Sequence, residues 1–450
     1  MKYATVNPCT NEVVKEFELD AFPDLSISER AFHIWRKKTV EERGAALHKV
    51  AQLLEKNKND YAALISLEMG KPLREAEYEI AKTITAFDYY ILHAPEMLAP
   101  KPVSSNASKS YIRFEPLGLI FSIMPWNFPF WQVFRFAVPS LISGNVTILK
   151  HAPSVPQCAK AIEQLFHEAG LPDGVFKSYF LSNEEAGKLI ADKRVRGISF
   201  TGSDATGSVL AEQAGKGLKK CVMELGGNDA FIVLNDADLE LTISGAIKSR
   251  SINSGQSCNG AKRFIVQAGI AEAFTKRLIE EVSKLNVGLP TDVSTQVGPL
   301  ARRDLAEKVQ QQINDSIAAG AVPHYGQPAY NMQGNFVQPV VLTNVKEGVR
   351  SFHEEVFGPA WSVIEVNTVE EAIAVANNSD YGLGASIWTA DVPLAEQLAP
   401  EIEAGNVFIN DIVKSDARMP FGGIKRSGFG RELSEYGLKE FVNIKTVYLK

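Results

Sequence analysis

Residues 119–124, with the sequence Leu-Ile-Phe-Ser-Ile-Met, form a nearly continuous apolar run that predicts a strand buried on both faces. Short strands are also predicted at 145–150 and 197–200, and the segment from 156 to 169 predicts a helix closed by Gly170. Strand, loop and helix therefore alternate along this part of the chain. This alternation predicts a parallel, doubly wound α/β sheet.

The same alternation restarts near Gly226, and it indicates a second α/β lobe. Residues 229–234 predict its first strand, and alternating elements continue to about residue 428. A chain of 450 residues is too long for one ordinary core, so two large lobes are expected. Residues 26–98 predict helices that precede the first sheet.

Two further segments, 110–116 and 441–449, read as strands because they alternate or are rich in β-branched and aromatic residues. The terminal strand has no obvious partner within a finished lobe. We therefore predict that it pairs across a subunit contact.

Composition excludes several classes of function. The net charge of −6, from 47 basic and 53 acidic residues, argues against a nucleic-acid partner and against a polybasic membrane anchor. The four cysteines form no CxxC pair, which fits a reducing compartment. The N-terminus has no apolar core of signal-peptide length, and no apolar run approaches the ~20 residues of a membrane span. We expect a cytoplasmic enzyme.

Cys258 lies in the run Asn-Ser-Gly-Gln-Ser-Cys-Asn-Gly, where small and polar residues surround it as they would a residue presented on a loop. Glu224 precedes a glycine pair upstream. A thiol and a carboxylate on glycine-rich turns suggest covalent catalysis with a separate base. Each residue also has a plain structural interpretation, as a packed cysteine or as a turn cap.

Other segments carry weaker signals. Asn127, in Pro-Trp-Asn-Phe-Pro after a buried strand, could donate an amide N–H to a developing oxyanion, or the segment could be a rigid aromatic turn. The loop from Gly202 to Gly207 offers backbone N–H groups to a phosphate but lacks the full G-x-G-x-x-G pattern. Lys150 ends a strand and could reach a ribose or remain solvated. The seven histidines show no metal spacing, so metal catalysis and phosphoryl transfer are disfavoured.

Together the motifs resemble those of the aldehyde dehydrogenase superfamily, and they occur in the family's order over essentially the whole chain. The six matching segments are 125–129, 200–203, 224–227, 255–258, 355–359 and 420–423. The resemblance implies two doubly wound α/β lobes, a Rossmann-like cofactor lobe and a catalytic lobe, plus a small β oligomerisation extension. It assigns 1–100 and 119–226 to the NAD(P)-binding domain, 227–428 to the catalytic domain, and 101–118 and 429–450 to the oligomerisation strands.

The resemblance also implies roles for individual residues. Cys258 matches the family's nucleophile, Glu224 its general base and Asn127 its oxyanion donor. The cofactor-contacting positions would be Trp126, Lys150, Pro153, Ser154, Gly202, Ser203, Gly207, Leu225, Glu355 and Phe357.

The predicted substrate depends on Arg135, a charged residue in an apolar stretch that is predicted to be helical. Such a residue needs either a substrate anion or a buried partner. The sequence is similar to bacterial succinate-semialdehyde dehydrogenases, in which an arginine and a serine hold the far carboxylate. Arg135 and Ser415 match these two residues, and Trp131 would line the pocket beside the aliphatic middle of the substrate. We expect a preference for ω-carboxylated aldehydes, above all succinate semialdehyde.

Cofactor choice is expected to depend on the residues after Lys150. NAD-specific members of the family commonly carry a glutamate where this chain has Pro153, and His151 and Ser154 could help to bind a 2′-phosphate. We therefore expect NAD as cofactor, with NADP also accepted.

Alternative functions stay open at this point. They are oxidation of another small aldehyde (glycolaldehyde, lactaldehyde or an aromatic aldehyde), acyl transfer to coenzyme A, or a non-catalytic structural role. The expected partners are a small aldehyde and other copies of the chain, as a homodimer or homotetramer.

Overall fold

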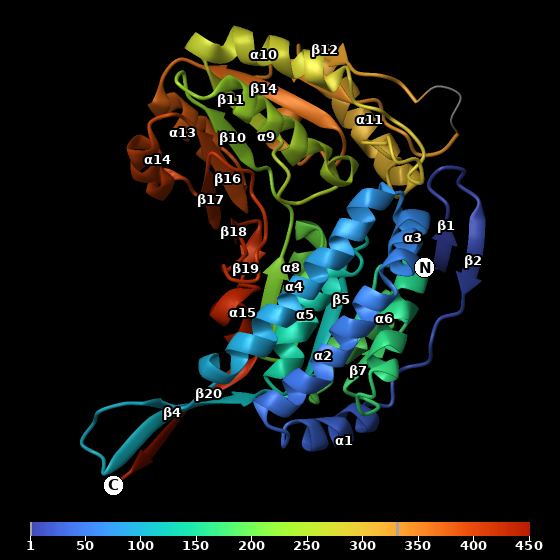
Figure 1. Cartoon of the computed structure of the whole chain (residues 1–450), viewed down its shortest axis with the longest axis vertical. Helices are drawn as coiled ribbons and strands as arrows, with labels where there is room; N and C mark the ends of the chain where they lie inside the picture. Colours follow the sequence, from blue (N-terminus) through green and yellow to red (C-terminus); the bar gives the residue numbers. More distant parts are fainter. Residues whose placement is uncertain (1, 330–332) are drawn as a thin grey trace.

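The first sheet forms where the apolar runs predict it. The computed structural model describes residues 2–329 and 333–450, and its lower lobe in Figure 1 contains a six-stranded sheet of order β19-β9-β8-β5-β6-β7. Five strands are parallel, and β19 is antiparallel to β9. The strands are β5 (Leu119–Met124), β6 (Val146–His151), β7 (Phe176–Ser178), β8 (Val195–Thr201), β9 (Lys220–Glu224) and β19 (Gly428–Phe429).

Helices of the N-terminal half pack against this sheet and share its hydrophobic core. The predicted helical region, 26–98, is confirmed as four helices, of which α2 starts with a Thr39–Glu42 capping box. The helices of this lobe are α1 (Leu25–Trp35), α2 (Val40–Lys56), α3 (Lys58–Met69), α4 (Leu73–Met97), α5 (Trp131–Ile142), α6 (Pro156–Glu168), α7 (Asn183–Ala191) and α8 (Asp204–Lys216).

The second lobe, at the top of Figure 1, is built on a seven-stranded sheet of order β12-β13-β14-β11-β10-β16-β17. Only β12 runs antiparallel to its neighbour, so the predicted second α/β lobe is confirmed. Its strands are β10 (Ala230–Val233), β11 (Arg263–Gln267), β12 (Val322–Tyr325), β13 (Val340–Thr343), β14 (Ala360–Val366), β16 (Gly384–Trp388) and β17 (Asn406–Ile409).

Helical segments also accompany the second sheet and the end of the chain. They are α9 (Leu239–Ser251), η1 (Ile252–Gly255), α10 (Ala268–Val282), α11 (Arg303–Ala318), α12 (Arg350–His353), α13 (Val369–Asn377), α14 (Val392–Leu398), η2 (Ala399–Glu401) and α15 (Ser434–Lys439). Two short strand pairs complete the lobes, β1 (Tyr3–Val6) with β2 (Val13–Phe17) and β15 (Tyr381–Gly382) with β18 (Ile424–Lys425). Among the helices of the described residues, none combines the length and apolarity that crossing a bilayer requires.

The terminal strand has a partner within the chain that the sequence analysis did not identify, and pairing of its other edge across a subunit contact stays a prediction. β20 (Val442–Leu449) pairs antiparallel with β4 (Lys109–Pro116) over its whole length, and β3 (Lys101–Pro102) pairs with the other edge of β4. The pairing was missed because the two strands lie more than 300 residues apart in sequence. Together they form an arm that projects from the lobes in Figure 1.

Candidate active site

The segment before Cys258 adopts a tight left-handed turn. Asn253 and Ser254 have φ values of 53° and 55°, and Gly255 has φ +79°. A Cβ on Gly255 would lie 2.3 Å from the carbonyl oxygen of Gly358, so only glycine fits there. The turn ends α9 and η1 sharply and places Cys258 beyond the end of the helix.

A hydrogen-bond network joins this turn to the loop that carries Asn127. Asn253 Nδ2 donates to the backbone oxygens of Asn127 at 2.8 Å and of Gln256 at 3.1 Å. Asn127 Nδ2 also donates to the Gln256 oxygen, at 3.2 Å, and an amide nitrogen carries a second N–H. Asn127 and the nucleophile loop are thus held together, as an oxyanion donor and a nucleophile must be.

Two buried cations that the sequence analysis did not single out hold the nucleophile loop through its carbonyl groups. Arg250 donates to the oxygens of Gly255 at 3.1 Å and of Gly358 at 3.0 Å. Lys262 Nζ donates to the oxygen of Ser257 at 3.0 Å and also to that of Cys258. No motif signals these roles, because the bonds that hold the loop end on backbone carbonyl groups.

Cys258 is partly buried in an apolar cluster that contains Trp131 and Phe421. Burial raises the pKa of its thiol to about 11, and the charges of Arg135 and Lys262 offset part of this rise. The sequence suggested that the thiol is exposed on a loop. In the structure the thiol is mostly protonated at neutral pH, so it must lose a proton before it attacks.

Glu224 ends β9 and is almost completely buried. Neither carboxyl oxygen has a hydrogen-bond partner among the described residues. Burial raises its pKa well above the usual range, and the nearby carboxylate of Glu432 adds to the rise. The backbone around Glu224 is fixed by β19, where Gly428 is its register partner, and by the oxygen of Ser427, which accepts from Leu225 N at 3.0 Å.

Several predicted cofactor residues come together between the lobes. The rings of Trp126 and Phe357 meet edge-to-face, with centroids 5.9 Å apart. Glu355 accepts a hydrogen bond from Gly227 N at 3.1 Å and forms an ion pair with Lys262 at 3.3 Å.

The other predicted cofactor residues gather at the ends of β6 and β8. Ser203 caps α8, and a Cβ on Gly207 would lie 2.6 Å from the Leu225 side chain, so helix and turn pack closely. Lys150 at the end of β6 has its pKa lowered to about 8 by burial alone. The Ser154 hydroxyl is buried without a hydrogen-bond partner in the described part of the chain. An uncompensated cation and an unpaired hydroxyl suit a ribose or phosphate group.

The family profile for aldehyde dehydrogenases matches residues 1–447. The chain belongs to the aldehyde dehydrogenase family. Nearly full coverage explains why six short motifs recur in the family's order.

Several similar proteins carry more specific names. A probable NADP(+) succinate-semialdehyde dehydrogenase of Synechocystis is 45% identical, with 100% of both chains covered. The NAD(P)+ succinate semialdehyde dehydrogenase Sad of Escherichia coli is 42% identical, over 99% of this chain and 97% of Sad. The crystal structure of a Streptococcus pyogenes succinic semialdehyde dehydrogenase in complex with NADP+ matches with a TM-score of 0.96 at 38% identity, covering 99% of each chain.

His151 does not serve as a phosphate ligand, contrary to the sequence interpretation. Its Nε2 lies 2.9 Å from the oxygen of Pro129, and its Nδ1 lies 2.9 Å from Ala152 N and 3.2 Å from the oxygen of Met124. Burial lowers its pKa to about 4. The ring is a neutral, fully engaged core group that links the aromatic turn to β6.

The three predicted substrate residues have different surroundings. Trp131 starts α5 and belongs to the cluster around Cys258. Arg135, one turn further on, forms a buried ion pair with Glu432 and lies over the ring of Phe421. The sequence left open whether its anion is a substrate or a protein group, and the structure supplies a protein carboxylate. Ser415 is hydrogen bonded to Lys82, which the sequence analysis missed.

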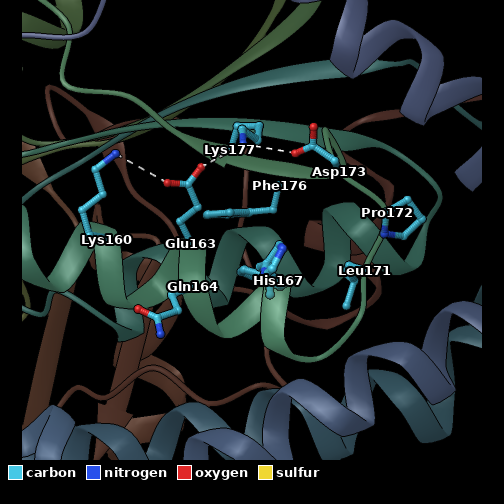
Figure 2. Close-up of a pocket in the computed structure, with 10 residues that line it drawn as sticks. Lys160, Glu163, Gln164, His167, Leu171, Pro172, Asp173, Phe176 and Lys177 are labelled. Carbon is cyan, nitrogen blue, oxygen red and sulfur yellow. Dashed lines mark hydrogen bonds and ion pairs between the residues drawn. The ribbon is translucent and has the colours of Figure 1, made fainter.

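A cleft of about 360 Å³ lies apart from these residues, between α6 and the loop before β7. Figure 2 shows Glu163 there between the ammonium groups of Lys160 and Lys177. None of the residues lining this cleft is in the predicted catalytic, cofactor or substrate set.

Proposed function

We propose that this protein oxidises succinate semialdehyde to succinate with NAD+ or NADP+ as electron acceptor. The observation that carries the proposal is the bond from the Asn127 amide to the loop of Cys258. The buried carboxyl of Glu224, which has no hydrogen-bond partner in the described chain, supports it. Family membership supports the reaction class. The names of the similar proteins support the substrate.

In the first half of the reaction the Cys258 thiol gives its proton to water, the sulfur bonds to the aldehyde carbon, and the electron pair of the carbonyl π bond moves to the oxygen, which becomes an oxyanion. The free N–H of the Asn127 amide and the Cys258 backbone N–H stabilise that charge, and losing one such donor typically costs about 10²–10³ in rate. A bound nicotinamide dinucleotide supplies the acceptor for the hydride that leaves this carbon. The acyl group then remains on Cys258 as a thioester.

In the second half Glu224 takes a proton from water, whose oxygen attacks the thioester carbon and releases the acid and the thiol. Burial raises the pKa of Glu224, and the carboxyl must be in its deprotonated form when it accepts this proton. A base without hydrogen-bond partners is free to turn toward this water. A functional base here also disfavours acyl transfer to coenzyme A.

The residues present fit a dinucleotide. Lys150 and Ser154 would bind the adenosine ribose or its 2′-phosphate, and the α8 N-terminus with Gly202 and Ser203 would face the pyrophosphate. Pro153 neither accepts a bond from a 2′-hydroxyl nor repels a 2′-phosphate. We therefore infer that both NAD+ and NADP+ are used, without a contribution from His151.

We also propose that 1–100 and 119–226 bind the cofactor, that 227–428 carry the catalytic loop, and that the arm formed by 101–118 and 429–450 joins subunits into a homodimer or homotetramer. Ile444, Tyr448 and Leu449 on the arm are 61%, 56% and 44% exposed, which is costly for a surface that stays in water. Light scattering of the purified chain tests the assembly, and a monomer would refute it.

Steady-state kinetics test the main proposal. Wild-type enzyme should oxidise succinate semialdehyde with a much higher kcat/KM than butanal, with either dinucleotide, and Cys258→Ala should abolish formation of the reduced cofactor. Substantial turnover by Cys258→Ala, or an equal preference for butanal, would contradict it.

A further inference from the structure

Lys82 is a cation of the active site that no sequence motif indicates. It lies on α4, and its ammonium donates a 2.8 Å hydrogen bond to the hydroxyl of Ser415, which comes from the other lobe. The same ammonium lies 4.5 Å from the ring centroid of Trp131. A lysine of α4 thus contacts both Ser415 and Trp131, and Trp131 shares an apolar cluster with Cys258.

Hydrogen bonds fix helix α4 against the N-terminus of α5, and they thereby fix the position of Lys82. Glu79, one turn before Lys82, accepts hydrogen bonds from the backbone N–H groups of Phe130 and Trp131, at 2.8 and 3.1 Å. Glu79 also forms a fully buried ion pair with Lys71. Because Glu79 holds the start of α5, Lys82 lies beside the Trp131 indole.

The charge of Lys82 has no carboxylate partner at ion-pair distance among the residues that the structure describes. Burial lowers the pKa of this lysine to about 8, and Arg135 lowers it further, while Glu79 and Asp416 act in the opposite direction. A desolvated cation without a paired anion gains free energy when a carboxylate binds beside it.

Arg135, in contrast, already has its anion. Its Nε pairs with Glu432, and its Nη2 lies 3.4 Å from the hydroxyl of Thr201. No hydrogen bond joins Arg135 to Ser415 in the described chain. The serine predicted to bind the substrate is therefore bound to the lysine and not to the arginine.

We propose that Lys82 and Ser415 together bind the far carboxylate of the aldehyde substrate, with Trp131 between this anion site and Cys258. Arg135 acts behind them as a positioning residue whose charge Glu432 balances. This inference rests on the proposed function, because it presumes a substrate with a carboxylate at the end opposite the aldehyde.

The order of these groups fits a short ω-carboxylated aldehyde. Trp131 shares one apolar cluster with Cys258, and its ring also lies against the Lys82 ammonium. The methylene groups of the substrate would cross the indole, with the aldehyde at the thiol and the carboxylate at the ammonium and hydroxyl. An uncharged aldehyde would leave Lys82 desolvated and unpaired, and an aldehyde with an ammonium group would be repelled.

Kinetics of Lys82→Met test the proposal. Hydrogen bonds to charged groups are the strong ones, so KM for succinate semialdehyde should rise roughly 10- to 100-fold. The value of kcat/KM for butanal should change far less, and Lys82→Arg should recover part of the loss. Lys49→Met is the matched control, because Lys49 lies on an exposed face of helix α2 and its loss removes the same charge.

The wild-type enzyme separates the two possible failures. If wild type does not prefer succinate semialdehyde over butanal, the proposed substrate is wrong. If wild type has that preference and Lys82→Met keeps it, only the assignment of Lys82 is overturned.

Product binding provides a readout that does not depend on turnover. Succinate should raise the unfolding temperature of the wild-type protein and of Lys49→Met, whereas butyrate should have little effect. Lys82→Met should lose most of the succinate shift. A shift that is unchanged in Lys82→Met would contradict the proposal.

Discussion

Lys82 and Arg135 are both cations near Cys258: Arg135 lowers the pKa of the thiol, and Cys258 raises the pKa of Lys82. Their partners within the protein differ. Arg135 is buried against Glu432, a carboxylate from near the end of the chain. Lys82 forms no ion pair in the described part of the chain and contacts a hydroxyl and an indole. A charge that the fold has already neutralised stabilises the protein's own arrangement, whereas a charge left without a counter-ion is available to a ligand.

The largest effect should come from breaking the neutralised pair. Glu432→Gln leaves the guanidinium of Arg135 buried without its anion, which should cost about 3–5 kcal/mol of folding free energy. Lys82→Met leaves no buried charge without its counter-ion, so the folding free energy of this variant should differ from that of wild type by less than about 1 kcal/mol. Urea unfolding of both variants measures the contrast.

A double variant, Arg135→Met with Glu432→Leu, is the control, because it removes both charges and should recover much of the lost stability. Wild-type stability in Glu432→Gln alone would mean that Arg135 does not depend on this pair, and the contrast with Lys82 would fail.

Charge reversal at Lys82 should change which aldehydes are accepted. In Lys82→Glu, kcat/KM for 4-aminobutanal should rise by about tenfold or more, and kcat/KM for succinate semialdehyde should fall by at least as much. The new carboxylate attracts the ammonium of the first substrate and repels the carboxylate of the second. Competition between the two aldehydes measures the switch. An unchanged ratio would place the substrate's far end elsewhere.

The pH dependence of KM should distinguish a charged Lys82 from a structural one. Above its pKa of about 8 this lysine loses its proton and its charge, so KM for succinate semialdehyde should rise by up to about tenfold per pH unit. Arg135, Glu79, Asp416 and Cys258 face this lysine. The pKa of Asp416 is lowered to about 2 and that of Cys258 is raised to about 11, so neither group changes its charge much in this pH range. KM for butanal should therefore stay flat between pH 8 and about 9.5, and a parallel rise would contradict the assignment.

The smallest effect is expected at Ser415. In Ser415→Ala the carboxylate loses a neutral hydroxyl partner while the ammonium remains, so KM for succinate semialdehyde should rise about 3- to 10-fold. The KM for butanal serves as the internal control. A loss larger than that of Lys82→Met would reverse the order of importance proposed for the two groups.

The three proposed catalytic residues could be singled out from the sequence because each lies in a local motif, and the family resemblance then implied their roles. Cys258 follows a glycine turn, Glu224 precedes a glycine pair, and Asn127 follows a buried strand. Such turns are encoded by neighbouring residues and are visible in short windows. The strands at 119–124 and 229–234 were predictable for the same reason, since burial on both faces leaves an apolar run.

The residues that support the site could not be predicted in this way. Asn253 contacts the Asn127 loop 126 positions away, and Lys82 contacts Ser415 across 333 positions. A lysine in a helix has the same local signature whether it faces water or a substrate. The pairing of β20 with β4 was missed for the same reason, because register between distant strands leaves no local pattern.

The sequence by itself determined the two α/β lobes and singled out Cys258, Glu224 and Asn127 as catalytic candidates, because periodicity and turn chemistry are local properties of the chain. Only the tertiary structure decided which of two cations is free. It brought Glu432 to Arg135 and left Lys82 beside Ser415 and Trp131, and the availability of a charge depends on what folding places next to it.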